Sequence, residues 1–319
     1  MQKLQNQTRP TRLEDLVDPS LVARLSHLDI TSRKLLSGKL KGERRSKRRG
    51  QSVEFADHRQ YSSGDDLRHI DWNIFGRLDR LFIKLFLEEE DLSLHVVLDA
   101  SGSADCGTPS KFLLMQKLAL AMGYIGLANL HRLSVTCIGG LGAPPADNPD
   151  GPREPQLIQS LRDLRGRRRL QDLSRFLLTL EPGGPSPFTE ACKRIAVTRR
   201  GKGVMLIISD YLLKEGYEDG LRLMLGQGYD VYAIQVLSPQ EIEPTLGGDL
   251  RLKDCEDGDL AEMTITAPLL KKYKATLQAY CNRFREFCNS RGITPMTVPS
   301  DTPVDVLVLE YLRRRGLVM

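Results

Sequence analysis

Cysteine is scarce in this sequence of 319 residues, and its spacing matches no metal-binding or redox motif. None of the six cysteines belongs to a C-x-x-C pair: Cys106, Cys137, Cys192, Cys255, Cys281 and Cys288. Neither a zinc site nor a disulfide framework is therefore indicated, and we expect reduced thiols. Cys137 and Cys192 lie among apolar residues, where cysteine packs as a small hydrophobic side chain.

Long hydrophobic runs are also missing. No stretch of about 18 apolar residues argues for a transmembrane helix, and the first residues, MQKLQNQTRPTRLEDL, lack the apolar core of a secretory signal. We therefore expect a cytoplasmic protein. A hydrophobic content of 40% is enough for the core of an ordinary globular domain.

Positive charge is concentrated in one stretch, although the net charge is only +5. Seven basic residues face a single acid, Glu43, in this stretch: Lys39, Lys41, Arg44, Arg45, Lys47, Arg48 and Arg49. The arginines could bind a phosphate or an acidic partner, although a solvated basic loop is the simpler interpretation. No aromatic residue interleaves them as a base-stacking surface requires, so nucleic-acid binding is the weaker alternative.

The chain divides into three parts by pattern. Residues 1–37 predict a helical extension, with Pro19 near a helix start. Residues 38–90 contain the basic loop and the string GDDLRHIDW, and we expect this region to pack on the main domain. Residues 91–319 show the alternation of buried strands and helices that is typical of a doubly wound, mainly parallel α/β sheet. An inserted β-hairpin is predicted near 245–266, around Asp257-Gly258.

Oxygen-bearing side chains follow the strand predicted at LHVVLD. Asp99, Ser101 and Ser103 come directly after its apolar residues. Ligands of doubly wound sheets bind outside the carboxyl ends of the strands, where Ser186 and Asp210 are also expected. Such residues are ordinary in turns and helix caps, but a second strand-terminal Asp favours a site for Mg²⁺ or another divalent cation such as Mn²⁺.

These residues resemble the metal-ion-dependent adhesion site of von Willebrand factor A domains. A second string, which includes Gly64, Asp65, Asp66, Arg68, Asp71, Trp72 and Arg77, is similar to the signature of "domain of unknown function" family 58. The resemblance extends from about residue 30 to the C-terminus. Ser186 stands where the family usually has Thr, which keeps the hydroxyl.

The resemblance implies a non-enzymatic role. Similar proteins are associated with MoxR-type AAA+ ATPases as partners or adaptors, and in such sites the cation keeps one coordination position for an acidic side chain of the partner. The alternatives are a metal-dependent hydrolase and a nucleic-acid-binding protein that uses the basic loop. None of the five histidines falls in a motif that supplies a base near the metal.

The GDDLRHIDW string itself is expected to be structural. Gly64 permits a positive φ, the Asp side chains cap backbone amides, and Trp72 is expected to bury its ring against the sheet. Arg68 and Arg77 would neutralise the carboxylates. A carboxylate cluster for acid/base or metal-assisted hydrolysis is the minor alternative.

Overall fold

The structure, a computed structural model, describes residues 9–32, 54–87, 92–142, 153–198, 203–256 and 258–319. The chain forms two compact units. The main unit comprises Met1–Leu40 and Leu92–Met319, and the small unit comprises Lys41–Asp91. The basic arginines Arg44, Arg45, Arg48 and Arg49 lie outside the described residues.

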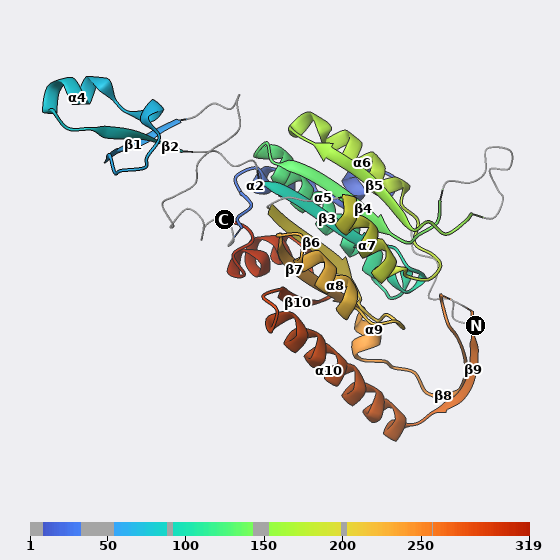
Figure 1. Ribbon diagram of the computed structural model, residues 1–319. Helices are drawn as coiled ribbons and strands as arrows, with labels where there is room; N and C mark the ends of the chain where they lie inside the picture. The colour runs from blue at the N-terminus through green and yellow to red at the C-terminus, as the bar shows by residue number, and fades with distance from the viewer. Residues whose placement is uncertain (1–8, 33–53, 88–91, 143–152, 199–202, 257) are drawn as a thin grey trace. The chain divides into compact units, whose positions relative to one another are not determined.

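The main unit is built on a six-stranded, mostly parallel sheet (Figure 1). Its strands, in spatial order, are β10 (Thr294–Pro299), β7 (Asp230–Leu237), β6 (Gly203–Ser209), β3 (Ser93–Asp99), β4 (Arg132–Ile138) and β5 (Ile158–Leu164). All neighbours are parallel except β4 and β5. Strands β6 and β7 are buried along their whole length, as central strands covered on both faces must be. The predicted α/β class is confirmed.

Helices cover both faces of this sheet. One hydrophobic cluster contains residues of α1 (Leu13–Leu16), α2 (Pro19–Leu25), α5 (Lys111–Ala128), α6 (Leu170–Thr179) and the C-terminal helical turns α11 (Val304–Val306) and η4 (Leu307–Leu312). The other contains residues of α7 (Phe188–Thr198), α8 (Glu218–Leu225) and α10 (Ala267–Asn289). These are the two outer layers of a doubly wound sheet.

Helix α5 is the central helix of the first layer. Ser110 caps it by accepting a hydrogen bond from the backbone N–H of Leu113. Among the described residues it is the one helix that is long and apolar enough to cross a membrane, and 83% of it is buried inside the structure. Its apolar composition is therefore matched by its place in the core.

The strand order places a topological switch point between β3 and β6. From β3 the chain continues to β4 and β5 on one side, then returns to β6 on the other side. Loops that leave two neighbouring parallel strands toward opposite faces open a crevice at their carboxyl ends. Asp99 ends β3, and Ser209 ends β6.

Two strand predictions had different outcomes. The hairpin expected around Asp257-Gly258 is present as β8 (Gly248–Lys253) and β9 (Leu260–Ile265), which pair antiparallel. Strand β5 was not predicted. It is an edge strand whose described residues are mostly half-buried or exposed, so its sequence, IQSLRDL, lacks the continuous apolar run that marks the central strands.

The small unit contains an antiparallel pair, β1 (Glu54–Gln60) and β2 (Phe82–Leu87). A 3₁₀ helix, η1 (Leu67–His69), and helix α4 (Trp72–Leu78) lie between the two strands in the sequence. The short helix α9 (Pro239–Ile242) belongs to the main unit.

Asp side chains of the GDDLRHIDW string cap backbone amides, as expected. Asp66 accepts a hydrogen bond from the N–H of Arg68, and Asp71 accepts from Asn73 and Ile74. Asp65 accepts from the N–H of Ser62.

The same carboxylates are paired with cations or ring nitrogens. Asp66 pairs with Arg68 at 2.7 Å, and Asp65 pairs with Arg59 at 2.9 Å. Hydrogen bonding to His58 is the largest of the effects that lower the pKa of Asp71 to about 2. Gly64 has the positive φ, 103°, that the turn needs, and Arg77 lies in the last turn of α4.

The expectation that Trp72 buries its ring is wrong. The residue is 65% exposed, and its ring makes an edge contact with Phe75 at a centroid distance of 6.1 Å. Trp72 begins a seven-residue helix that has no buried residue. A two-stranded ribbon with one short helix offers too little apolar surface to enclose an indole.

We expect Trp72→Ala to change the free energy of unfolding by less than about 1 kcal/mol, because an exposed ring contributes little to the core. Trp72 is the sole tryptophan, so native fluorescence reports on it alone. Emission at the wavelength of a solvated indole is expected. A blue-shifted maximum, or a loss of about 3 kcal/mol or more, would contradict the exposed position.

Candidate functional site

The site predicted from the sequence lies at the carboxyl ends of β3 and β6. The loop that follows β3 is held to the loop before α7 by two backbone hydrogen bonds. Gly102 N–H donates to the carbonyl of Gly184 at 2.8 Å, and Gly183 N–H donates to the carbonyl of Ala100 at 2.9 Å. These bonds bring Ser186 from a distant part of the chain to the end of β3.

Asp99 is the centre of the resulting network. Its carboxylate accepts hydrogen bonds from the backbone N–H of Ser101 at 3.0 Å, from Ser186 Oγ at 3.2 Å and from Ser209 Oγ at 2.7 Å. Ser101 Oγ lies 2.9 Å from Ser103 Oγ. The structure therefore brings four of the five predicted residues together, and it adds Ser209, which the sequence prediction missed.

The carboxylate of Asp99 is buried and does not face solvent. The residue is 1% exposed. Burial, followed by the negative charge of Asp210, raises the pKa of Asp99 to about 6. Because burial and a second negative charge destabilise the ionised form of Asp99, a cation beside this carboxylate would stabilise that form.

Asp210, the fifth predicted residue, is bound to a buried lysine. Lys111 Nζ donates to Asp210 Oδ2 at 2.7 Å and to Glu241 Oε1 at 2.6 Å, and Lys111 is completely buried. Burial opposes the ammonium charge, but these two carboxylates outweigh it and raise the pKa of Lys111. Asp210 is close enough for its negative charge to raise the pKa of Asp99. The carboxylate of Asp210 itself accepts hydrogen bonds from Lys111 Nζ and from the N–H of Leu212.

The sequence analysis predicted no role for Lys111 or Glu241, although each occupies a position in the sequence that is informative. Lys111 is the first residue of α5, where the positive end of the helix dipole disfavours a cation and an anionic partner is needed. Glu241 forms a capping box with Ser238. The pattern S-x-x-E identifies such a helix start, but it does not indicate the distant lysine.

A segment of the β8–β9 hairpin also reaches the site. Glu256 lies close enough to Ser103 for the Ser103 hydroxyl to favour the ionised form of its carboxyl. Burial, together with the charges of Asp99 and Asp210, raises the pKa of Glu256 above its usual value. The sequence predicts the hairpin but contains no signal for where its tip lies, so this carboxylate was missed.

The donor set fits a hard cation. One carboxylate and the hydroxyls of Ser101, Ser103 and Ser186 are linked by hydrogen bonds, and all are oxygen donors of the kind that Mg²⁺ prefers. Over the described ranges, no group of three His, Cys, Asp or Glu side chains is arranged to hold a metal ion. A cation here would therefore depend on hydroxyl oxygens and retained waters as well as on Asp99, which is common for Mg²⁺.

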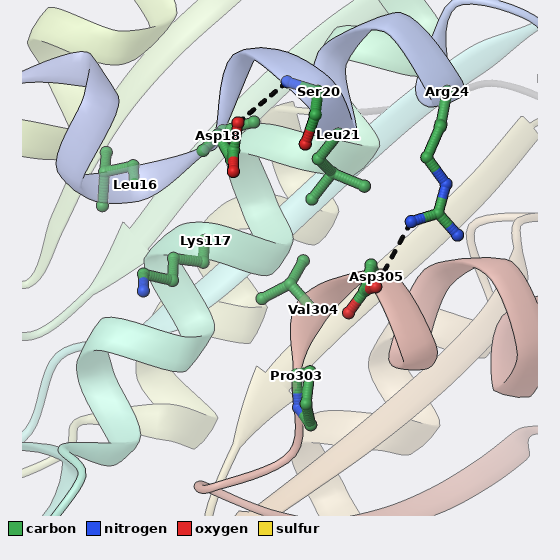
Figure 2. Close-up of a pocket in the computed structure, with 10 residues that line it drawn as sticks. Leu16, Asp18, Ser20, Leu21, Arg24, Lys117, Pro303, Val304 and Asp305 are labelled. Carbon is green, nitrogen blue, oxygen red and sulfur yellow. Dashed lines mark hydrogen bonds and ion pairs between the residues drawn. The ribbon is translucent and has the colours of Figure 1, made fainter.

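A separate cleft of about 370 Å³ lies in the main unit (Figure 2). Residues of α1, α2, α5 and α11 line it. Arg24 and Asp305 form an ion pair across it at 3.3 Å, and Asp18 caps the N–H of Ser20. None of the predicted site residues lines this cleft.

Cation binding to Asp99 is expected to depend on pH. With a pKa of about 6, the carboxyl must lose its proton to bind a cation, so Mg²⁺ affinity should rise up to about tenfold per pH unit from pH 5 to 6 and level off above pH 7. Calorimetry in buffers of different ionisation enthalpy measures the proton released. If Mg²⁺ binding released no proton at pH 5.5, the assignment of Asp99 as a ligand would be contradicted.

The cation-free protein should show the opposite trend in stability. The native pKa of Asp99 lies above the ordinary value of 3.8, so between about pH 4 and 6 the native state binds more protons than the unfolded state. The contribution of Asp99 to stability is therefore complete below pH 4 and is lost as the pH rises through 6. Urea unfolding of the parent and of Asp99→Asn across this range isolates that contribution.

Comparison with known proteins places the chain in a family. The model of "Protein of unknown function DUF58" matches residues 57–281. The chain belongs to this family. The match includes the whole GDDLRHIDW string, the Asp99 loop and the β8–β9 hairpin, so the DUF58 resemblance seen in the sequence is confirmed.

Several mycobacterial relatives are similar over most of the chain or part of it. "Uncharacterized protein Rv1480" of Mycobacterium tuberculosis (strain ATCC 25618 / H37Rv) is 26% identical over 310 residues, which cover 95% of this chain and 92% of the relative. "Uncharacterized protein MAV169" of Mycobacterium avium is 30% identical over 119 residues, 37% of this chain and 70% of the relative. The alignment with Rv1480 thus covers nearly the whole of both chains, whereas the alignment with MAV169 covers about a third of the DUF58 chain.

Among solved structures, the conserved hypothetical protein BatB from Bacteroides thetaiotaomicron is 13% identical, with a TM-score of 0.39 over 70% of this chain and 98% of that one. An aerotolerance-related membrane protein from Bacteroides fragilis NCTC 9343 is 14% identical, with a TM-score of 0.37 over 70% and 99%. The pilus adhesin SpaC from Lactobacillus rhamnosus GG is 10% identical, with a TM-score of 0.41 over 72% and 30%.

Proposed function

We propose that this DUF58 protein is a von Willebrand factor A-like interaction module that holds Mg²⁺, or another divalent cation such as Mn²⁺, and uses it to bind an acidic side chain of a partner. Asp99, Ser101, Ser103 and Ser186 would hold the cation, with Asp210 beside them. The observation that carries the proposal is the convergence of a buried carboxylate and three hydroxyls at the switch point of the sheet.

The charge balance supports a cation. Asp99 and Asp210 are both buried, and the one buried lysine described beside them is shared between Asp210 and Glu241. Within the described part of the chain, Asp99 receives hydroxyl and amide hydrogen bonds and no ion pair that would balance its charge. Buried charges are stable in proteins mainly when they are paired or coordinate a metal.

An acidic partner is supported by Glu256. A cation that is coordinated by one carboxylate and by neutral hydroxyls keeps a net positive charge and attracts a further carboxylate. Glu256 already lies against Ser103, so the edge of the site accommodates a carboxylate in addition to Asp99. A partner side chain of the same kind would take that position.

A binding role fits the surroundings better than catalysis. A hydrolase needs a positioned base or nucleophile beside the metal. His95 lies within β3 and bonds to Thr136, away from the strand end, and Lys111 is held by two carboxylates. The partner we propose is a MoxR-type AAA+ ATPase, a class that rests on the family resemblance, and the protein would act in the cytoplasm as its partner or adaptor.

Capture of a purified MoxR-type ATPase from the same organism tests this function. We expect the parent to bind with Mg²⁺ and to lose binding in EDTA, and Ser101→Ala to bind at least about tenfold more weakly because a ligand is lost. A variant with Arg44, Arg45, Arg48 and Arg49 neutralised should weaken only modestly, since exposed charges are screened by salt. Binding that survives EDTA and collapses on neutralisation would make the basic loop the interface.

A further inference from the structure

The tip of the β8–β9 hairpin is fastened to the candidate site. The tip segment is defined here as Asp254–Glu256. Asp254 pairs with Lys214 at 2.9 Å, and Lys214 lies in the loop that follows β6. Asp254 N–H donates to the carbonyl of Asp259 at 2.8 Å, and within the tip segment Glu256 N–H donates to Asp254 Oδ1 at 2.8 Å.

The tip segment also packs closely on the loop that follows β3. A Cβ atom added to Gly102 would lie 2.5 Å from the carbonyl oxygen of Cys255, a separation that real side chains do not adopt. Glycine is therefore required where the two backbones meet. Together with the proximity of Glu256 to Ser103, this contact places the tip segment against the loop that follows β3.

Two cysteines meet at this contact. Cys106 Sγ donates to the carbonyl of Gly102 at 3.9 Å, and the backbone of Cys255 packs on the same glycine, so both cysteines lie beside Gly102. The two thiols are close enough to shift each other's pKa, downward for Cys106 and upward for Cys255. Cys106 is partly exposed and Cys255 is exposed, whereas the other four cysteines are buried. The two thiols that solvent can reach are thus neighbours in space, although 149 positions separate them in the sequence.

We propose that Cys106 and Cys255 form a reversible disulfide that fixes the tip segment over the loop that follows β3. The sequence predicts reduced thiols, and the wide separation of these two cysteines along the chain gives no sign that they lie close together. A disulfide between these residues would close a long loop. Cross-links that close long loops remove the most conformational entropy from the unfolded chain.

The oxidant is a low-molecular-weight disulfide such as oxidised glutathione. The thiolate of one cysteine attacks this disulfide, forms a mixed disulfide and releases one glutathione thiolate. The second cysteine, as its thiolate, attacks the protein sulfur of the mixed disulfide and releases the second glutathione. Two protein thiols are oxidised, one glutathione disulfide is reduced to two thiols, and the two protons pass to the glutathione thiolates.

The consequence for binding rests on the proposed function. The disulfide would hold Glu256 beside Ser103, where a partner carboxylate is expected to bind, and so would exclude the partner. Reduction would allow the tip segment to leave. The bond itself can be tested without any cation or partner.

Peptide mapping of the folded protein after oxidation with oxidised glutathione tests the pairing. Trypsin produces peptides 85–111 and 254–271, each with a single cysteine. We expect these two peptides to be linked in most molecules, the link to disappear with dithiothreitol, and Cys255→Ser to abolish it, while the control Cys281→Ser retains it. A glutathione adduct on Cys255 without the link, or links to other cysteines, would overturn the proposal.

Hydrogen exchange tests the closure. In cation-free buffer, peptides that cover residues 99–106 and 254–256 should exchange at least about tenfold more slowly in the oxidised parent than in the reduced parent, because opening is blocked. Oxidant-treated Cys255→Ser should match the reduced parent. Equal exchange in both states would overturn closure. Mg²⁺ titration of the reduced parent tests the proposed function separately, so the two failures can be distinguished.

Discussion

Asp99→Asn is expected to abolish Mg²⁺ binding while the protein remains folded. Two unit charges about 4 Å apart interact by about 4 kcal/mol at an effective dielectric constant of about 20, and a directly bound dication interacts more strongly. The loss of the carboxylate charge should therefore weaken Mg²⁺ binding by about a thousandfold or more. Calorimetric titration at pH 7.5, where Asp99 is ionised, measures the effect.

The fold should tolerate this change because asparagine keeps the shape of aspartate. One amide oxygen can still accept from the N–H of Ser101, and the buried charge that Asp210 disfavours is removed. The thermal midpoint of the cation-free variant should equal or exceed that of the parent. Asp105→Asn is the matched control, since Asp105 lies in the same loop but faces Arg9 at 3.8 Å. Unchanged Mg²⁺ affinity in folded Asp99→Asn would refute the assignment.

Lys111→Met is expected to produce the largest loss of stability. Methionine preserves much of the volume of the buried side chain but leaves Asp210, which is 1% exposed, without its cation. Breaking a buried ion pair by removing one partner costs about 3–5 kcal/mol. Urea unfolding of the cation-free protein measures this loss, and Lys117→Met on the same helix, a control outside the ion-pair network, should cost about 1 kcal/mol or less.

A double variant distinguishes lost pairing from lost packing. If the cost arises from the unpaired carboxylate, Lys111→Met combined with Asp210→Asn should be more stable than Lys111→Met alone, because the uncompensated charge is gone. If the free-energy losses of the two single variants simply add in the double variant, the ion pair is not what stabilises this edge of the sheet. Equal stabilities for Lys111→Met and Lys117→Met would contradict the buried-pair interpretation altogether.

The central strands and the order of the helices could be predicted from the sequence. Strands such as β6 and β7 are buried on both faces and have continuous apolar runs, and the helices between them show clear periodicity. Asp99, Ser101 and Ser103 could be singled out because a parallel strand brings its last residues to a known edge. Ser186 required the additional rule that loops at this edge converge.

What the sequence could not predict depends on contacts between distant residues. Lys111, Glu241 and Glu256 reach the site from three separate segments, and no spacing rule connects them with Asp99. Strand β5 lies at the sheet edge, where half-exposed residues mask the strand pattern. Trp72 was expected to be buried because indoles usually are, but burial depends on how much apolar surface surrounds the ring.

Diffraction from crystals soaked in Mn²⁺, recorded near the manganese absorption edge, tests the central claim most directly. The account predicts an anomalous peak at roughly 2.0–2.3 Å from oxygen atoms of Asp99, Ser101 or Ser103, a distance typical of hard divalent cations, and no peak there in Asp99→Asn. At a Mn²⁺ concentration that saturates other sites of the crystal, the absence of a peak beside Asp99 in the parent would contradict it.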